Sequence, residues 1–180
     1  NRPATMRSIR VATRLNPASL YFWINGARII AYDMAAWRIQ EAEAAGHVPQ
    51  AEKQRIARQQ GHEALEMLAK AEAFFPGRAL LEIEKAQVEL HALRNPGRAA
   101  TRFSAAANCS DAPLYCIRIA AELVRKEGRL QEAQGLLKQG LQSLDERMQR
   151  GRVARAAEER AILMSRIDAL QKELETVPYK

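Results

Sequence analysis

The chain has 180 residues, of which 47% are hydrophobic, enough for one compact domain or a short stack of repeated units, and its composition does not indicate disorder. Its 28 basic residues, 21 of them arginine, exceed 21 acidic ones and give a net charge of +7. This excess favours an acidic polypeptide, an anionic membrane surface or nucleic acid as a partner, unless it serves only solubility, and the sequence contains no run of 18 apolar residues that could span a bilayer.

The first expected element is a helix over residues 3–15. Thr5, Ile9 and Ala12 fall on one helical face, and Asn16-Pro17 ends the helix because a residue before proline is pushed out of the helical region. The chain does not begin with methionine. We therefore interpret this element as the second helix of a hairpin whose first helix lies in a missing upstream segment.

Residues 18–76 are expected to form an extended helical hairpin. Apolar residues recur at three- and four-residue steps along its first arm, and Gly46-His47-Val48-Pro49 breaks the helix before the second arm begins. Pro76-Gly77 ends the second arm. Arms of about 26 residues would be roughly 39 Å long, so this hairpin should protrude beyond its neighbours.

Two shorter hairpins are expected over residues 79–107 and 113–144, and they share one pattern. Six positions of the first recur 34 residues later in the second. They are Ile83, Ala86, Leu90, Ala99, Phe103 and Ala106, matched by Ile117, Ala120, Val124, Ala133, Leu137 and Gly140. Apolar or small residues kept in register across one shift indicate stacked helical hairpins rather than a single globular core.

Residues 146–176 are expected to form one long amphipathic helix. Its apolar positions recur at three- and four-residue steps, and they are Val153, Ala156, Leu163, Ile167, Leu170 and Leu174. A terminal repeat leaves an apolar face bare, so this helix is interpreted as a cap. The alternative is a coiled-coil contact that joins two copies of the chain.

The repeated hairpins resemble the tetratricopeptide repeat (TPR) family, whose pattern alternates small and bulky residues in two helices. The preceding hairpin contributes Phe22, Gly26, Ile29, Ala64, Leu68, Ala71 and Pro76 to the same pattern. The resemblance covers roughly residues 3–144 and implies an all-α, right-handed helical-hairpin solenoid with a C-terminal capping helix. One departure is the wide spacing between Gly26 and Ala64, which lengthens the first hairpin by an insert rich in good helix formers.

The same resemblance implies a concave groove lined by the first helix of each hairpin. The residues that it places there are Trp23, Glu84, His91, Tyr115, Arg118 and Arg125. Such a mixed polar groove suits an extended peptide or a helix, and an exposed Trp23 would be its main anchor. In the alternative interpretation Trp23 belongs to the core and packs against the helix over residues 3–15.

The sequence offers no candidate catalytic, metal or cofactor site. It contains no Gly-rich phosphate loop after a strand and no plausible Ser, His and Asp set, and its three histidines are scattered. Two cysteines, Cys109 and Cys116, are too few for a disulfide framework, although they could bridge locally in an oxidising compartment. The densest basic run, Arg147 to Arg160, lacks interleaved aromatic residues, which argues against nucleic acid as a partner.

We therefore expect a non-catalytic protein-protein interaction or assembly module that binds a protein or peptide and needs no cofactor. Two alternatives stay open. One is a subunit of a bacterial envelope complex, which contacts the membrane only through a segment absent from this chain and favours a periplasmic or membrane-tethered location. The other is a regulatory domain of an enzyme or of a nucleic-acid-associated machine carried elsewhere in a longer protein. The C-terminal helix could also support a homo-oligomer.

Overall fold

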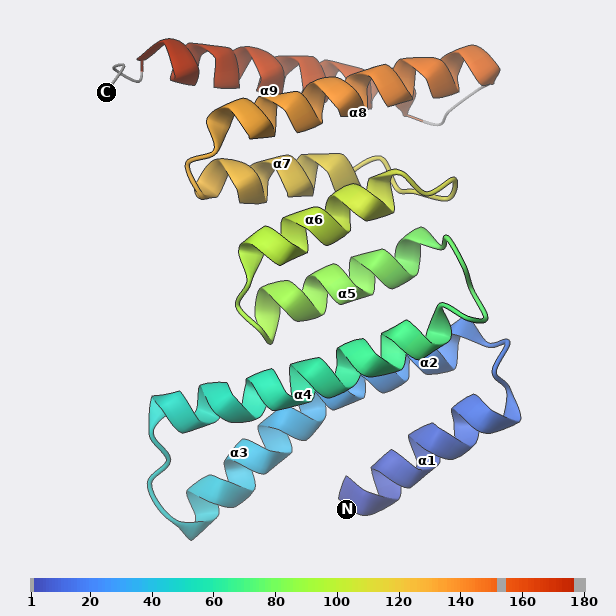
Figure 1. Cartoon of the computed structure of the whole chain (residues 1–180), viewed down its shortest axis with the longest axis vertical. Helices are drawn as coiled ribbons and strands as arrows, with labels where there is room; N and C mark the ends of the chain where they lie inside the picture. Colours follow the sequence, from blue (N-terminus) through green and yellow to red (C-terminus); the bar gives the residue numbers. More distant parts are fainter. Residues whose placement is uncertain (1, 152–154, 177–180) are drawn as a thin grey trace.

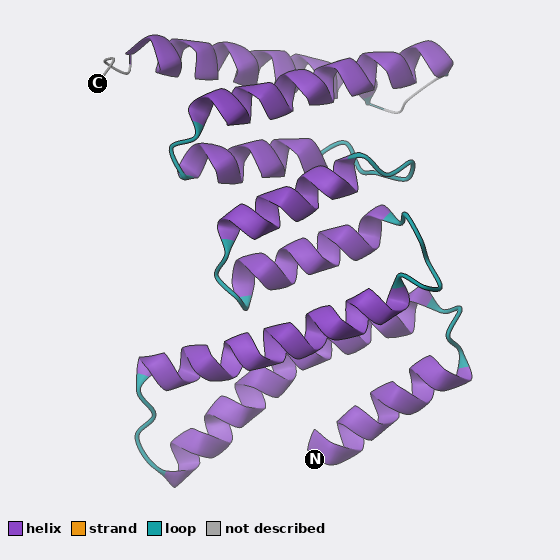
Figure 2. Cartoon of the chain, viewed as in Figure 1, coloured by secondary structure: helices purple, strands orange, loops and turns teal. Residues whose placement is uncertain are grey.

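The computed structural model describes residues 2–151 and 155–176, and this part of the chain consists of helices joined by short turns, without strands (Figures 1 and 2). The elements are α1 (Arg2–Leu15), α2 (Leu20–Arg28), the π-helix η1 (Ile29–Asp33), α3 (Met34–Ala45), α4 (Gln50–Ala71), α5 (Ala79–His91), α6 (Pro96–Ala107), α7 (Cys116–Lys126), α8 (Leu130–Arg150) and α9 (Ala156–Thr176). The chain is therefore all-α over the residues described.

The helices are stacked in chain order along the longest axis of the molecule, with α1 at one end and α9 at the other (Figure 1). From α5 onward each helix packs extensively against the one that follows it. Contacts between helices that are near in sequence dominate this arrangement, which is the pattern of a protein assembled from successive hairpins.

The first hairpin is longer than the others (Figure 1). Residues 18–76 contain α2, η1 and α3 in one continuous arm and α4 in the other. The turn between the arms includes Gly46, at φ 155°, and the buried Val48. The elements α2, η1 and α3 all contact α4, but only Met34 and Ala35 of α3 are buried, and α3 diverges from α4 toward the tip of the hairpin (Figure 1).

Local signals explain the turn between α5 and α6. The side chain of Asn95 accepts a hydrogen bond from the backbone nitrogen of Arg98 (3.1 Å), which caps α6, and Pro96 occupies its first turn, where no N–H is needed. Arg94 has φ of 53°, a left-handed conformation that directs the chain away from α5. At the next hairpin Gly128 takes the corresponding role between α7 and α8, with φ of 79°.

Two apolar clusters form the interior, and α5 belongs to both. On one side Leu81 and Val88 pack with residues of α2, η1 and α4, which together we call the N-terminal core. On the other side Ile83 and Ala86 pack with residues of α6, α7, α8 and α9, which form the C-terminal core. The helix α5 therefore joins the long hairpin to the rest of the stack.

Glycines allow two of the close helix approaches. A methyl group built on Gly140 of α8 would lie 2.6 Å from Cγ2 of Ile117 on α7, and one built on Gly26 of α2 would lie 2.9 Å from Cγ2 of Ile9 on α1. Both distances are far shorter than van der Waals contact. The small residue of the 34-residue pattern at position 140 is thus needed for the packing of α7 against α8.

The C-terminal part differs from the expectation of one helix over residues 146–176. The helix α8 continues to Arg150, and α9 begins only at Ala156, so the chain turns at Gly151, whose φ is 161°. Of the expected apolar positions, Ala156, Leu163 and Leu170 are buried in the C-terminal core. Val153 lies outside the described residues. The hairpin expected over 113–144 is likewise shifted, with α7 beginning at Cys116.

We predict that Gly140→Ala lowers the free energy of unfolding by about 1–3 kcal/mol, because the added methyl group overpacks the contact with Ile117. Gly135→Ala on the same helix is the matched control. A methyl group there would meet nothing within 4 Å, so better helix propensity should raise stability by roughly 0.5–1 kcal/mol. Chemical denaturation of both variants measures the difference, and equal effects would contradict the close approach of α7 and α8.

A second prediction concerns the register of the repeated hairpins. Phe103 and Leu137 occupy matching positions and are both almost completely buried. Leu137→Ala should destabilise the chain by about 2–5 kcal/mol, because it removes apolar contacts and leaves a cavity. Leu15→Ala, at a leucine that is 81% exposed, should change stability by less than about 0.5 kcal/mol. Thermal unfolding that is unchanged by Leu137→Ala would refute this register.

Candidate functional site

The six residues that sequence analysis assigned to a groove lie on or directly before the helices α2, α5 and α7. Trp23 is on α2, Glu84 and His91 are on α5, and Tyr115 immediately precedes α7, which carries Arg118 and Arg125. The structure relates Glu84 to Tyr115, but it buries Trp23 in the core and leaves His91 in a separate cleft. Arg118 and Arg125 contact α9.

Trp23 is not an exposed anchor, because only 8% of it is accessible to solvent. Its indole Nε1 donates a hydrogen bond to the backbone oxygen of Pro17 (2.9 Å), and its ring stacks on Phe74 with centroids 5.7 Å apart. The hydrogen bond satisfies the polar atom of the indole, so the rest of this large ring can be buried in the N-terminal core. The alternative that placed Trp23 in the core describes its burial correctly.

Phe22, one of the positions that the first hairpin contributes to the TPR pattern, is 36% exposed. It packs edge-to-face against the neighbouring Tyr21, with ring centroids 5.7 Å apart. The buried residues of α2 include Trp23 and Gly26, so Gly26 keeps its place in the pattern while Trp23 is buried instead of Phe22. Gly26 lies on the side on which α1 approaches.

Glu84 is buried on α5 and is held by an arginine from the preceding hairpin. Nε of Arg28 donates to Oε2 of Glu84 (2.9 Å), and Nη2 of Arg28 contacts the other carboxylate oxygen. The hydrogen bond and the charge of Glu84 raise the pKa of the Arg28 guanidinium, although its partial burial opposes them. This ion pair fixes a charge-assisted link between α2 and α5.

Two tyrosines lie close enough to Glu84 for its charge to act on them. Burial raises the pKa of Tyr32 and the Glu84 carboxylate raises it further, whereas Arg28 lowers it. The pKa of Tyr115 is raised by burial, by Cys116 and by Glu84. We call Arg28, Tyr32, Glu84 and Tyr115 the Glu84 cluster. It joins side chains from α2, η1, α5 and the residue before α7, so three successive hairpins contribute to one site.

The Glu84 cluster combines a fixed interior with accessible edges. Glu84 is buried and Tyr32 is half-buried, whereas Arg28 is exposed and Tyr115 is 40% exposed. The exposed guanidinium can donate hydrogen bonds to carbonyl or carboxylate oxygens, and the ring of Tyr115 offers apolar surface beside its hydroxyl group. Arg28 and Tyr32 could not be assigned to this site from the sequence, because their proximity to Glu84 depends on how the long hairpin packs on α5.

Arg118 and Arg125 contact the last helix rather than open solvent alone. Nε of Arg118 lies 2.6 Å from Oε1 of Glu159, a buried carboxylate of α9. Arg125 pairs with Glu122 of its own helix (3.0 Å) and with Glu173 of α9 (3.6 Å). Both cations therefore help to hold α9 against α7, which leaves them less available to a partner than sequence analysis expected.

His91 is exposed near the end of α5, in a separate cleft of about 270 Å³. The charged side chains that line this cleft with it are Lys53 and Arg58 of α4 and Arg94 of the following turn. The cleft lies beside the turn between α5 and α6, whereas Tyr115 lies in the next turn along the chain, between α6 and α7. His91 is thus a peripheral member of the predicted groove.

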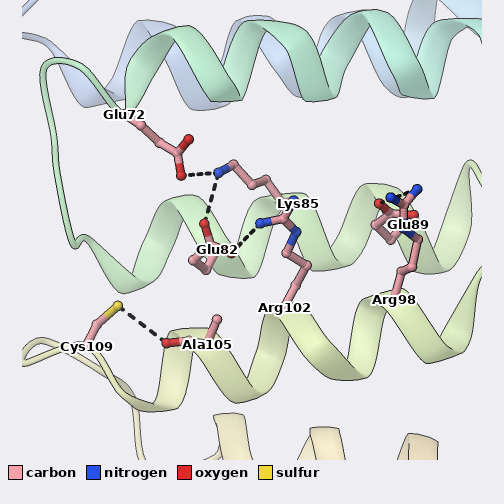
Figure 3. A network of polar contacts seen from close by, with 8 residues as sticks. All are labelled: Glu72, Glu82, Lys85, Glu89, Arg98, Arg102, Ala105 and Cys109. Carbon is pink, nitrogen blue, oxygen red and sulfur yellow. Dashed lines mark hydrogen bonds and ion pairs between the residues drawn. The ribbon is translucent and has the colours of Figure 1, made fainter.

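A second polar network stabilises the link between the hairpins (Figure 3). The ammonium group of Lys85, almost completely buried on α5, contacts Glu72 at the end of α4 and Glu82 one turn earlier on its own helix (2.9 Å). Arg102 of α6 also pairs with Glu82 (3.1 Å). Burial raises the pKa of Glu82, but Lys85 and Arg102 outweigh it, so the pKa is lowered overall. Lys85 is enclosed and pairs with both carboxylates, which indicates a structural role.

Comparison with known proteins adds no family assignment. No protein-family model matches the chain, and comparisons with curated proteins and with solved structures find no match. Within residues 2–151 and 155–176, no group of three or more His, Cys, Asp or Glu side chains could hold a metal ion. None of the helices described is long and apolar enough to cross a membrane. A functional proposal therefore depends on the geometry of this chain.

The two cysteines are free and differ in environment. Cys116, beside the Glu84 cluster, is completely buried, and burial together with Cys109 raises its pKa to about 11. Cys109 is partly accessible, and its Sγ donates to the backbone oxygen of Ala105 (3.6 Å; Figure 3). Because the thiolate is the reactive species, Cys116 should be inert while the chain is folded.

We therefore predict that a disulfide exchange reagent modifies one thiol quickly at pH 8 under native conditions and the second only after unfolding. Cys109→Ser should abolish the fast phase, and Cys116→Ser should leave it unchanged, because Cys109 is the accessible thiol. The released chromophore measures both phases. Two equally fast thiols in the native chain would contradict the burial of Cys116.

Proposed function

We propose that the chain is a non-catalytic interaction module that binds a polypeptide segment across the face carrying the Glu84 cluster. The architecture that we infer is the one implied by the TPR resemblance, a right-handed solenoid with α2, α5 and α7 as the first helices of successive hairpins and with α9 as a cap. Solenoids of this kind characteristically bind extended partners along one face, because each repeat presents side chains at regular intervals.

The observation that carries the proposal is the convergence of three hairpins on Glu84. A partner that crossed this face would meet Arg28 from α2, which pairs with Glu84, and Tyr115 before α7, whose pKa the charge of Glu84 helps to raise. Arg and Tyr are enriched among residues that dominate binding energy at interfaces. Because Glu84 already orients Arg28, little side-chain entropy remains to be lost when a partner binds.

The contacts also suggest how such a partner is recognised. The guanidinium of Arg28 retains donors that are not directed at Glu84, which suits backbone carbonyl groups or a carboxylate of the partner. The exposed ring of Tyr115 suits an apolar side chain. We therefore propose Tyr115, rather than the buried Trp23, as the main aromatic anchor. Arg118 and Arg125 define the border of the site, where α9 engages them.

The proposal can be tested with peptides selected for binding from a random display library. Tyr115→Ala should weaken the selected peptides by about 1–2 kcal/mol, a five- to thirtyfold rise in Kd measured by fluorescence anisotropy, because it removes the aromatic anchor. Arg58→Ala and Gln131→Ala, which change exposed residues on α4 and α8, should leave Kd unchanged.

Arg28 is kept intact in this test, because its removal would leave the buried Glu84 without a partner and destabilise the fold. Thermal unfolding of Tyr115→Ala checks that the variant is folded. Peptides that bind Tyr115→Ala and the wild type equally, but lose affinity for the Arg58→Ala variant, would place the binding face elsewhere and overturn the proposal.

A further inference from the structure

The positive charge of the chain is concentrated at its N-terminal end. Residues 1–32 contain five arginines and no acidic residue, because Asp33 is the first carboxylate in the sequence. The remaining residues carry 23 basic and 21 acidic side chains, so they contribute only two of the seven net charges. Charge excess is therefore a local property of the first elements rather than a general property of the surface.

The helix α1 displays these charges without partners. Arg7, Arg10 and Arg14 are all exposed, and the residues described include no ion-pair partner for any of them. On the opposite side of α1, Met6 and Ile9 pack against the N-terminal core. This contact turns Arg7 away from the core, whereas Arg10 and Arg14 line a cleft beside it with Glu63 and Glu66 of α4.

Apolar side chains share the exposed face of α1 with the arginines. Val11 is 48% exposed and Leu15 is 81% exposed. At 100° per residue Val11 lies between Arg7 and Leu15 around the helix, and Arg14 flanks Arg7 on the other side. After the turn the beginning of α2 adds Tyr21, which is 69% exposed, and Phe22. The exposed face of α1 therefore carries both basic and apolar side chains, and exposed aromatic side chains follow at the start of α2.

We propose that α1 and the beginning of α2 form a docking surface for an anionic lipid membrane. An interfacial helix of this kind lies parallel to the bilayer, with its arginines at the headgroup phosphates and its apolar side chains at the upper edge of the acyl chains. The long stems of arginine allow both contacts at once, because the guanidinium can extend to the phosphates while Val11 and Leu15 are inserted.

The combination of groups favours a membrane over other polyanions. Nucleic acid phosphates would neutralise the arginines but would leave Leu15 and Val11 in water, and a polar acidic peptide would do the same. Tyr is enriched at the membrane-water interface, and Phe and Leu are typical of the apolar face of a basic interfacial helix. None of these residues belongs to the Glu84 cluster, so membrane docking would leave that face free for a polypeptide.

The test uses the purified chain in co-sedimentation with two kinds of vesicle. Binding is expected to vesicles of phosphatidylcholine mixed with phosphatidylglycerol and not to vesicles of phosphatidylcholine alone, and added salt should weaken it. Replacing all three arginines (Arg7→Gln, Arg10→Gln and Arg14→Gln) should weaken binding on the order of 100-fold. Leu15→Ser should weaken it on the order of tenfold, because the most exposed apolar side chain of α1 is lost.

A matched control removes the same number of charges elsewhere, through Arg38→Gln, Arg58→Gln and Arg94→Gln on the long hairpin and the turn after α5. This control should bind the mixed vesicles as the wild type does, and circular dichroism shows whether each variant is folded. Equal losses in both triple variants would reduce the effect to net charge and overturn the proposal. A chain that does not bind the mixed vesicles, but does bind polyglutamate or duplex DNA, would also overturn the proposal. The partner of α1 would then be an acidic polymer.

Discussion

The arrangement of the whole chain depends on α5 being buried on two sides. Leu81 and Val88 complete the core of the long hairpin, while Ile83 and Ala86 complete the core of the helices that follow. A helix packed on two sides cannot keep all its polar residues in water, and α5 also buries Glu84, Lys85 and Glu89. Burying such charges is costly unless each finds a partner. The contacts of Glu84 with Arg28 and of Lys85 with Glu72 therefore determine how the two halves of the stack are joined.

The same contacts connect stability with the proposed polypeptide site. Glu84 is held in place for a structural reason, because it links α2 to α5, and that fixed position orients Arg28 at the surface. Arg118 and Arg125 show the opposite case, since their pairs with Glu159 and Glu173 attach α9 and leave little for a partner. Ion pairs between elements thus separate the polar residues of the first helices into those that bind other helices and those that remain accessible.

Much of the helical arrangement could be predicted from the sequence, because the 34-residue register reports directly on packing. Phe103 and Leu137 hold matching buried positions, and Gly140 is small because Ile117 contacts it. Three features were not predicted. The phase of α2 depends on the stacking of Trp23 on Phe74, and the Glu84 cluster depends on the docking of separate hairpins. Both are decided by contacts between distant residues, which periodicity along one helix does not contain. The break between α8 and α9 is different, because Gly151 marks it locally in the sequence.

The π-helical turn η1 limits which substitutions and deletions the long hairpin can accept. Its wider turn holds more residues than an α-helical turn, so it sets the rotation of α3 relative to α2. Ile30 and Ala31 within η1, and Met34 and Ala35 after it, are all buried. Removal of one residue from η1 would rotate α3 by about 100° and carry Met34 and Ala35 out of their buried positions. The segment should therefore accept substitutions of similar size while its length stays constant, so that length rather than composition is the constrained property of this arm.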